Sequence, residues 1–198
     1  ILPIAFFAIW LILYFQFKRI STTLLVFSGI LFAWSGGFIL LWLYGQPWFM
    51  DFSLFGHNLR DLFQMGTVNL SVAVWVGFLA LFGIATDNGV LVCTYLQQVF
   101  RENNPRSLEE IRAATVQAGA RRVRPAMMTS ATTLLALLPV LTSTGRGANI
   151  MVPMAIPSFG GMLLAILTLF VVPVLFCALA EIKAGSDQIK ARITKYLP

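Results

Sequence analysis

Charged side chains are scarce in this sequence. Only 11% of its 198 residues are Asp, Glu, Lys or Arg, whereas 58% are hydrophobic. A soluble globular domain carries about 25% charged and about 45–50% apolar residues. The shortage of charge excludes an ordinary soluble domain and a disordered chain, so it indicates an integral membrane protein.

Residues that build disulfides, metal clusters and active sites are also few. The chain has two cysteines and one histidine, and Cys93 and Cys177 lie in separate apolar runs. No Cys-x-x-Cys pair is present, so neither a disulfide scaffold nor a zinc finger is expected. His57 stands alone in an aromatic segment. The sequence also lacks a nucleophile–base pair and a Gly-rich phosphate loop, so we predict that the protein is not an enzyme and has no cofactor.

Long apolar stretches dominate what is there. A helix needs about 20 apolar residues to cross a bilayer, and a spanning helix satisfies its own backbone hydrogen bonds. The sequence therefore predicts an all-α fold, a polytopic bundle of five transmembrane helices. The first stretch starts at Ile1 without a Met or a signal peptide, so we interpret the chain as a piece of a longer protein. The five stretches are 1–17, 20–45, 70–98, about 123–143 and about 153–180.

Lys and Arg are distributed unevenly among the connections. The first and third connections and the C-terminal tail hold most of them, whereas the second and fourth hold only Arg60 and Arg146. Positive loops stay in the cytoplasm, so we predict a periplasmic N-terminus and a cytoplasmic C-terminus. The net charge of +6 then comes from this sorting and not from a surface for nucleic acid.

These observations divide the chain into six parts. Two helices (1–45) precede an aromatic-rich periplasmic segment at the membrane interface (46–69) and a third helix (70–98). A cytoplasmic amphipathic connector (99–121), two more helices (122–180) and a cytoplasmic tail (181–198) follow.

The connector contains a helix-start signal. Ser107 and Glu110 form a capping-box pattern that opens a short helix. On one face of it recur Leu108, Ile111, Thr115 and Ala118. We expect this helix to lie along the inner membrane surface, and a solvated connector helix is the alternative.

Small residues recur at intervals of four in the apolar stretches. Such spacing lets helices approach closely, so it predicts one tight bundle. Pro139, Pro157 and Pro173 each remove a backbone donor and can kink a helix. The spaced pairs and triplets are Gly29, Ala33 and Gly37; Ala73 and Gly77; Ala85 and Gly89; and Gly161 and Ala165.

Asp87 is the most informative side chain. It is the only acidic residue within the five apolar stretches, and it lies well inside the third. Placing an Asp at the centre of a membrane helix costs about 2.5–3.5 kcal/mol, so such residues are usually proton carriers, ion ligands or halves of buried pairs. We predict a functional role for Asp87, with Asn88 as a hydrogen-bond donor; a structural acid that never changes charge is the alternative.

The fourth stretch offers partners for this acid. Arg122 and Thr129 are seven residues apart, about two helical turns, so they share a face. Thr132 and Thr133 continue the polar character. Two alternatives remain open, because Arg122 can extend to the inner membrane boundary and the threonines can bond back to their own helix.

Methionine thioethers suit soft ions such as Cu(I), although methionine is also a common core residue. Met151 and Met154 flank the outer start of the fifth stretch. Both are candidate metal contacts.

Several ordered motifs resemble one family. Residues 71–90, SVAVWVGFLALFGIATDNGV, are similar to the tenth transmembrane helix of resistance-nodulation-division (RND) efflux pumps. Residues 122–130, RVRPAMMTS, with Leu137–Pro139, resemble the eleventh. Residues 144–148 and 157–162 resemble the following loop and the twelfth helix. The heavy-metal efflux branch, of the copper/silver and cobalt-zinc-cadmium types, is the most similar.

The resemblance implies a homotrimeric, multi-pass pump of the bacterial inner membrane. Such pumps are driven by proton influx, and a periplasmic adaptor and an outer-membrane channel complete their path. Asp87 falls where metal pumps carry an acid, and Arg122 and Thr129 fall on positions associated with the proton relay. Met151 falls where copper/silver pumps have a methionine that passes the ion along. Ala126 follows Pro125, where the copper/silver branch carries a lysine.

The sequence therefore predicts proton-driven efflux of heavy-metal cations, with this chain forming the C-terminal proton-relay helices. One alternative is a multidrug or lipid exporter of the same superfamily. Another is a non-transporting membrane accessory of protein translocation.

Overall fold

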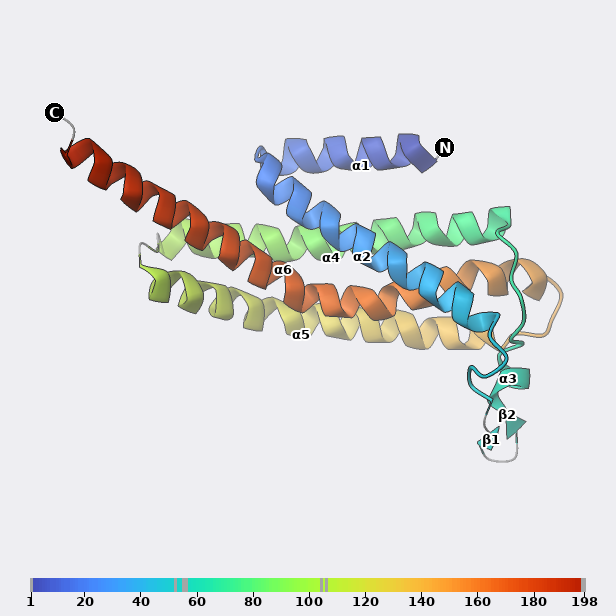
Figure 1. Ribbon diagram of the computed structural model, residues 1–198. Helices are drawn as coiled ribbons and strands as arrows, with labels where there is room; N and C mark the ends of the chain where they lie inside the picture. The colour runs from blue at the N-terminus through green and yellow to red at the C-terminus, as the bar shows by residue number, and fades with distance from the viewer. Residues whose placement is uncertain (1, 52, 55–56, 104, 106, 197–198) are drawn as a thin grey trace.

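A computed structural model describes residues 2–51, 53–54, 57–103, 105 and 107–196. Figure 1 shows long helices running alongside one another, with a small unit of two strands and a short helix at one end of the bundle. The elements are α1 (Leu2–Phe17), α2 (Ile20–Tyr44), β1 (Ser53–Leu54), β2 (His57–Asn58), α3 (Leu59–Leu62), α4 (Val72–Asn103), α5 (Leu108–Leu141) and α6 (Ala148–Tyr196).

The predicted all-α bundle is confirmed in its main features. Four helices, α2, α4, α5 and α6, are long and apolar enough to cross a membrane. The predicted first span appears as α1, which has 16 residues and is shorter than the other four. β1 and β2 form a two-residue antiparallel pair, which the all-α prediction did not include.

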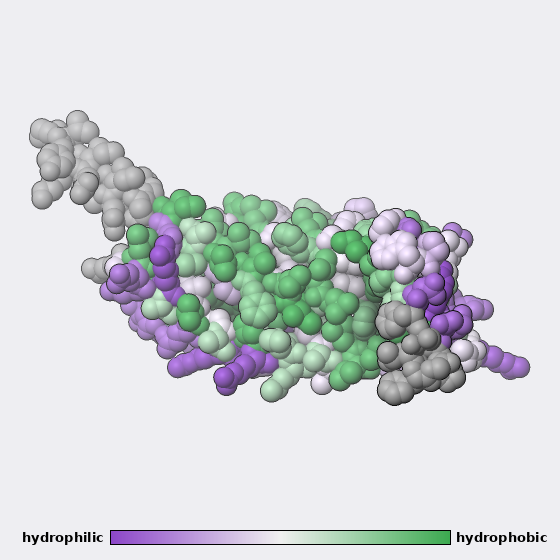
Figure 2. Space-filling model, turned by 60° about the horizontal axis from the view of Figure 1, so that its bottom comes forward, coloured by the Kyte–Doolittle hydropathy of each residue, from purple (hydrophilic) through white to green (hydrophobic). Residues whose placement is uncertain are grey.

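Apolar residues surround the middle of the bundle. Figure 2 shows a hydrophobic band between two ends where hydrophilic residues gather. This is the distribution that a bilayer selects, because lipid excludes charged groups from its hydrocarbon core. An apolar band between two hydrophilic ends is typical of a multi-pass membrane protein.

The start of α5 confirms the predicted capping box. Ser107 Oγ accepts from the Glu110 backbone N–H at 3.2 Å, and the Ser107 N–H donates to Glu110 Oε2 at 3.3 Å. The helix then continues to Leu141 through Pro125 and Pro139. The predicted short connector helix and the fourth span are therefore one helix of 34 residues, which corrects the expected break.

The first half of α5 packs on the bundle. Ile111, Thr115 and Ala118 are buried, as their recurrence on one face predicts, whereas Leu108 is exposed. Helix-forming Ala, Arg and Gln fill the stretch between the cap and the apolar part, so no residue there ends the helix. This face contacts the neighbouring helices. A place along the inner membrane surface stays a prediction.

The last helix is also longer than its apolar stretch. α6 runs for 49 residues, so the predicted tail continues the fifth span as a helix. Figure 1 shows that α6 bends near its middle. Pro173 lies close to that middle, where it removes the hydrogen bond to the carbonyl four residues earlier.

Glycines bring α2, α4 and α6 into close contact. A Cβ added at Gly160 would lie 2.6 Å from the Gly36 carbonyl oxygen, so the two backbones meet where α2 crosses α6. A Cβ at Gly77 of α4 would overlap the carbonyl oxygen of Met154 of α6. The predicted tight bundle is confirmed here, since any side chain would force the helices apart.

Candidate functional site: a polar face on α4 and α5

Two faces of α4 differ sharply in how they are covered. One face is buried against α2 and α6 and includes Val74, Phe78 and Leu81, which are 0% exposed. The opposite face is open in this chain. At helical spacing it carries Val76, Ala80, Gly83, Asp87, Leu91 and Thr94, all of which are exposed.

Asp87 lies in the middle of this open face. Its carboxylate makes no ion pair or side-chain hydrogen bond with any described residue of the chain. A Cβ added at Gly83, one turn before it, would meet nothing within 4 Å. The small residues before Asp87 on this face, Ala80 and Gly83, leave room for another helix, which lipid-facing positions do not require.

Asn88 points elsewhere. It is 9% exposed and lies on the buried side of α4, because successive residues of a helix are about 100° apart. The structure therefore separates Asn88 from Asp87, although the two are adjacent in sequence. A hydrogen bond between their side chains is absent among the described residues.

The height of Arg122 along the bundle follows from where α5 begins. Because α5 starts at Leu108, Arg122 is fourteen residues into the helix, a rise of about 21 Å. Asp87 is sixteen residues from the end of α4 at Asn103, a rise of about 24 Å. The two helices are antiparallel neighbours (Figure 1). The helical rise therefore places Asp87 and Arg122 at similar heights.

The guanidinium of Arg122 is partly enclosed. Its Nε is buried and has no hydrogen-bond partner among the residues that the structure describes. Arg122 lies at the edge of the buried face of α5, which also holds Ala126 (5% exposed) and Ser130 (1% exposed). Burying a donor of a permanently charged group without an acceptor costs free energy. A carboxylate or carbonyl oxygen beside Arg122 would remove that cost.

The threonines satisfy themselves. Thr129 Oγ1 donates to the Ala126 carbonyl at 3.0 Å, and Thr133 Oγ1 donates to the Thr129 carbonyl at 2.8 Å. Thr132 Oγ1 donates to the carbonyls of Met128 and Thr129 at 3.0 and 2.9 Å. Bonding back to the helix, the alternative considered for these residues, is what the structure shows. Each hydroxyl oxygen keeps its lone pairs for an incoming donor.

Sequence reasoning did not single out two buried serines. Ser130 Oγ is buried and without a partner among the described residues, and it lies on the same face as Ala126. Ser158 Oγ donates to the Gly77 carbonyl at 3.0 Å and thereby joins α6 to α4. In the sequence, each of these serines lies about one helical turn from a small residue, and this spacing could have indicated that they are buried.

The two candidate metal contacts lie in the first turns of α6. Met151 is 47% exposed, whereas Met154 is half-buried and its carbonyl oxygen faces Gly77. Among the described residues, His, Cys, Asp and Glu form no group of three that could hold a metal ion. His57 lies in β2, and its side chain is outside the described set.

Comparison with known proteins identifies the class. Residues 62–180 match the model of the AcrB/AcrD/AcrF family. The chain is 34% identical over 178 residues to the cation efflux system protein CusA of Escherichia coli K12, covering 86% of this chain and 15% of that protein. It is 33% identical over 178 residues to the cobalt-zinc-cadmium resistance protein CzcA of Cupriavidus metallidurans, covering 89% of this chain and 14% of that protein.

A solved structure agrees with these sequences. The crystal structure of a heavy metal efflux pump superposes on the chain with a TM-score of 0.67 and 25% identity, covering 91% of this chain and 15% of that one. The chain therefore belongs to the AcrB/AcrD/AcrF family of RND transporters. Its relatives in the heavy-metal efflux branch, as predicted, place it in the bacterial inner membrane as a multi-pass protein. It spans about 15% of the length of these relatives.

Proposed function

We propose that this chain forms the C-terminal proton-relay helices of a pump that expels heavy-metal cations in exchange for protons. The relatives named for cation efflux and for cobalt-zinc-cadmium resistance support this class of substrate. The observation that carries the proposal is the position of Asp87. It is the one carboxyl group within the apolar stretches of the sequence, and it sits among small residues on a face of α4 that this chain leaves open.

The proposed cycle uses the charge of Asp87. The carboxylate takes up a proton from the periplasmic side and releases it toward the cytoplasm. The change in charge alters its attraction to neighbouring helices and tilts them. A proton that moves down 100 mV releases about 2.3 kcal/mol, which is comparable to the cost of placing an Asp in the membrane. The driving force is therefore sufficient for a modest rearrangement.

Arg122 is our candidate for a fixed positive charge. It shares the height of Asp87 and has a buried Nε without a partner among the described residues. In the proposed relay it attracts the ionised carboxylate and releases it on protonation. The Thr129 hydroxyl accepts a hydrogen bond along the path of the proton. Asn88 is buried and packs on the covered side of α4, without a contact to Asp87.

The cation path begins outside the described helices. Met151, exposed at the outer start of α6, is placed to receive or pass a soft ion, and Met154 lies one turn further in. The ligands that select the ion lie in the remainder of the protein. We propose a homotrimer that works with a periplasmic adaptor and an outer-membrane channel.

Growth in the presence of metal salts tests the proposal. Asp87→Asn keeps the size of the side chain and removes its charge, so we expect loss of metal resistance while the protein still reaches the membrane. Asp51→Asn, the same change at an exposed residue of the connection between α2 and α4, serves as the matched control and should retain resistance. Resistance that survives Asp87→Asn would refute the relay role.

The same assay separates the alternatives. A multidrug or lipid exporter would protect cells against detergents and dyes but not against copper, silver, zinc or cobalt salts. A non-transporting accessory of protein translocation would show no dependence on any of these compounds. We expect protection against the metal salts alone.

A further inference from the structure

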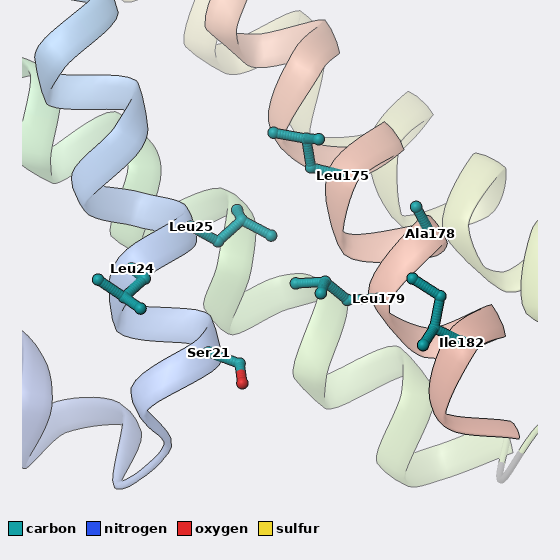
Figure 3. A pocket seen from close by; sticks show the side chains of 7 residues that line it. All are labelled: Ser21, Leu24, Leu25, Leu175, Ala178, Leu179 and Ile182. Atoms are coloured by element: carbon teal, nitrogen blue, oxygen red, sulfur yellow. The ribbon is translucent and has the colours of Figure 1, made fainter. Parts of the chain in front are cut away.

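A pocket opens between α2 and α6 at the end of the bundle that holds the first connection. Its volume is about 440 Å³, within the range of about 300–1,000 Å³ that small-molecule sites occupy. Figure 3 shows α2 on one side and α6 on the other. Ser21 is its one polar lining residue, and its apolar lining includes Leu24, Leu25, Leu175, Leu179 and Ile182.

Contacts from α4 hold the two walls in place. Gln97 Nε2 donates to Thr22 Oγ1 of α2 at 3.3 Å, next to Ser21. The Phe100 ring meets Phe176 of α6 edge-on, with centroids 5.2 Å apart. The last turns of α4 thus contact both helices that form the pocket.

The rim of the pocket is basic. Lys18 and Arg19 precede Ser21, and Lys183 follows Ile182; all three are exposed and none forms an ion pair with a described residue. The nearest acid in sequence, Glu181, is engaged elsewhere, since Arg112 Nε donates to its Oε1 at 2.7 Å. Positive charge therefore sets the potential at this end of the pocket.

The start of α2 adds backbone donors. Its N-cap, Arg19, is extended and makes no side-chain capping bond, and the first intrahelical bond reaches Thr23. The N–H groups of Ile20, Ser21 and Thr22 are therefore without helical partners. These donors and the helix dipole favour an anionic oxygen beside Ser21.

We propose that this pocket binds an anionic phospholipid of the membrane. One acyl chain fills the apolar space between α2 and α6. The phosphate lies against the N-terminus of α2 and is held by Lys18, Arg19 and Lys183. Basic pockets between transmembrane helices bind anionic headgroups in this way, and each Lys or Arg near the surface strengthens the attraction to an anionic lipid. The site is independent of the metal and proton steps.

Lipid binding to the complete, delipidated pump tests the proposal by native mass spectrometry. Phosphatidylglycerol and phosphatidylcholine with identical acyl chains are the two probes, because the first has a net negative headgroup and the second a zwitterionic one. We expect phosphatidylglycerol to bind at least about tenfold more tightly. Neutralising two basic residues in Lys18→Gln/Arg19→Gln should weaken its binding roughly tenfold or more, and should leave phosphatidylcholine binding unchanged.

Matched variants separate the pocket from general charge and exposure. Leu179→Trp fills the pocket and should abolish tight binding, whereas Leu135→Trp, at a position on α5 that is 64% exposed, should not. Arg121→Gln/Arg146→Gln removes two exposed charges away from the pocket and should change affinity less than about twofold. Equal binding of both lipids, or equal loss in the two double variants, would overturn the proposal. A protein helix seated in the pocket of the complete pump would also overturn it.

Discussion

The two faces of α4 show what this chain completes and what it leaves open. On the covered face, Gly77 and Phe78 contact α6 and α2 so closely that no added atom fits beside the glycine. On the open face, Gly83 has free space and Asp87 has no partner among the described residues. Both faces carry small residues, so residue size alone does not distinguish them.

The difference indicates that the open face is built for contact with parts of the protein beyond these helices. An exposed carboxylate is stable in water but costly in hydrocarbon. Asp87 therefore needs a covering helix or a water-filled path in the membrane, and its small neighbours provide room for either. The covered face holds this chain's helices together, and we propose that the open face contacts other parts of the protein.

The largest effect is expected from enlarging the two glycines. Gly77→Leu places a side chain into the Met154 carbonyl, so we expect destabilisation of about 3 kcal/mol or more and little protein in the membrane. Gly83→Leu, the same change on the open face, leaves the packing of this chain intact. In the complete pump it should reach the membrane at wild-type amounts and lose transport.

Membrane-fraction immunoblots and metal resistance, measured together, check this contrast. If Gly83→Leu transports normally, no helix packs on the open face and the two faces do not differ as we describe.

A smaller effect is expected at Arg122. Arg122→Gln removes the partly buried charge at the height of Asp87 and should slow metal-coupled proton uptake about tenfold. Arg121→Gln, at the adjacent exposed residue, should have little effect, because solvent screens that charge. Initial rates in proteoliposomes measure both variants. Equal rates for the two would remove Arg122 from the relay.

The smallest effect is expected at Thr129. Its hydroxyl already donates to the Ala126 carbonyl, so it cannot also donate a proton to the relay without breaking that bond. Thr129→Val should therefore lower the transport rate less than about threefold, and Thr132→Val should leave it unchanged. A loss of activity in Thr129→Val as complete as that in Asp87→Asn would show that the hydroxyl carries protons itself.

The sequence predicted most of the fold because hydrophobic length decides what crosses a membrane. It also predicted the cap at Ser107 and close packing at Gly37, Gly77 and Gly161, since both signals are local. It did not predict that α5 would be continuous. An amphipathic segment followed by an apolar one indicates two elements when periodicity alone is considered, and only packing against α4 and α6 shows them to be one helix.

The candidate site was predictable only in part. A lone Asp in an apolar stretch is visible in the sequence. The sequence also shows that Arg122 and Thr129 lie on one face of their helix. The height of Arg122 along the bundle depends on where its helix begins, which the sequence placed near residue 123 and the structure places at Leu108. The divergence of Asp87 and Asn88 follows from helical geometry, but which of the two faces is covered depends on the neighbouring helices.

Proton uptake by proteoliposomes that contain the complete pump tests the role of Asp87 most directly. A pH-sensitive dye reports proton movement when a metal-ion gradient is imposed. The account predicts that Asp87→Asn abolishes this coupled flux while Asp51→Asn retains it. A coupled flux of wild-type size in the Asp87→Asn protein would contradict the account.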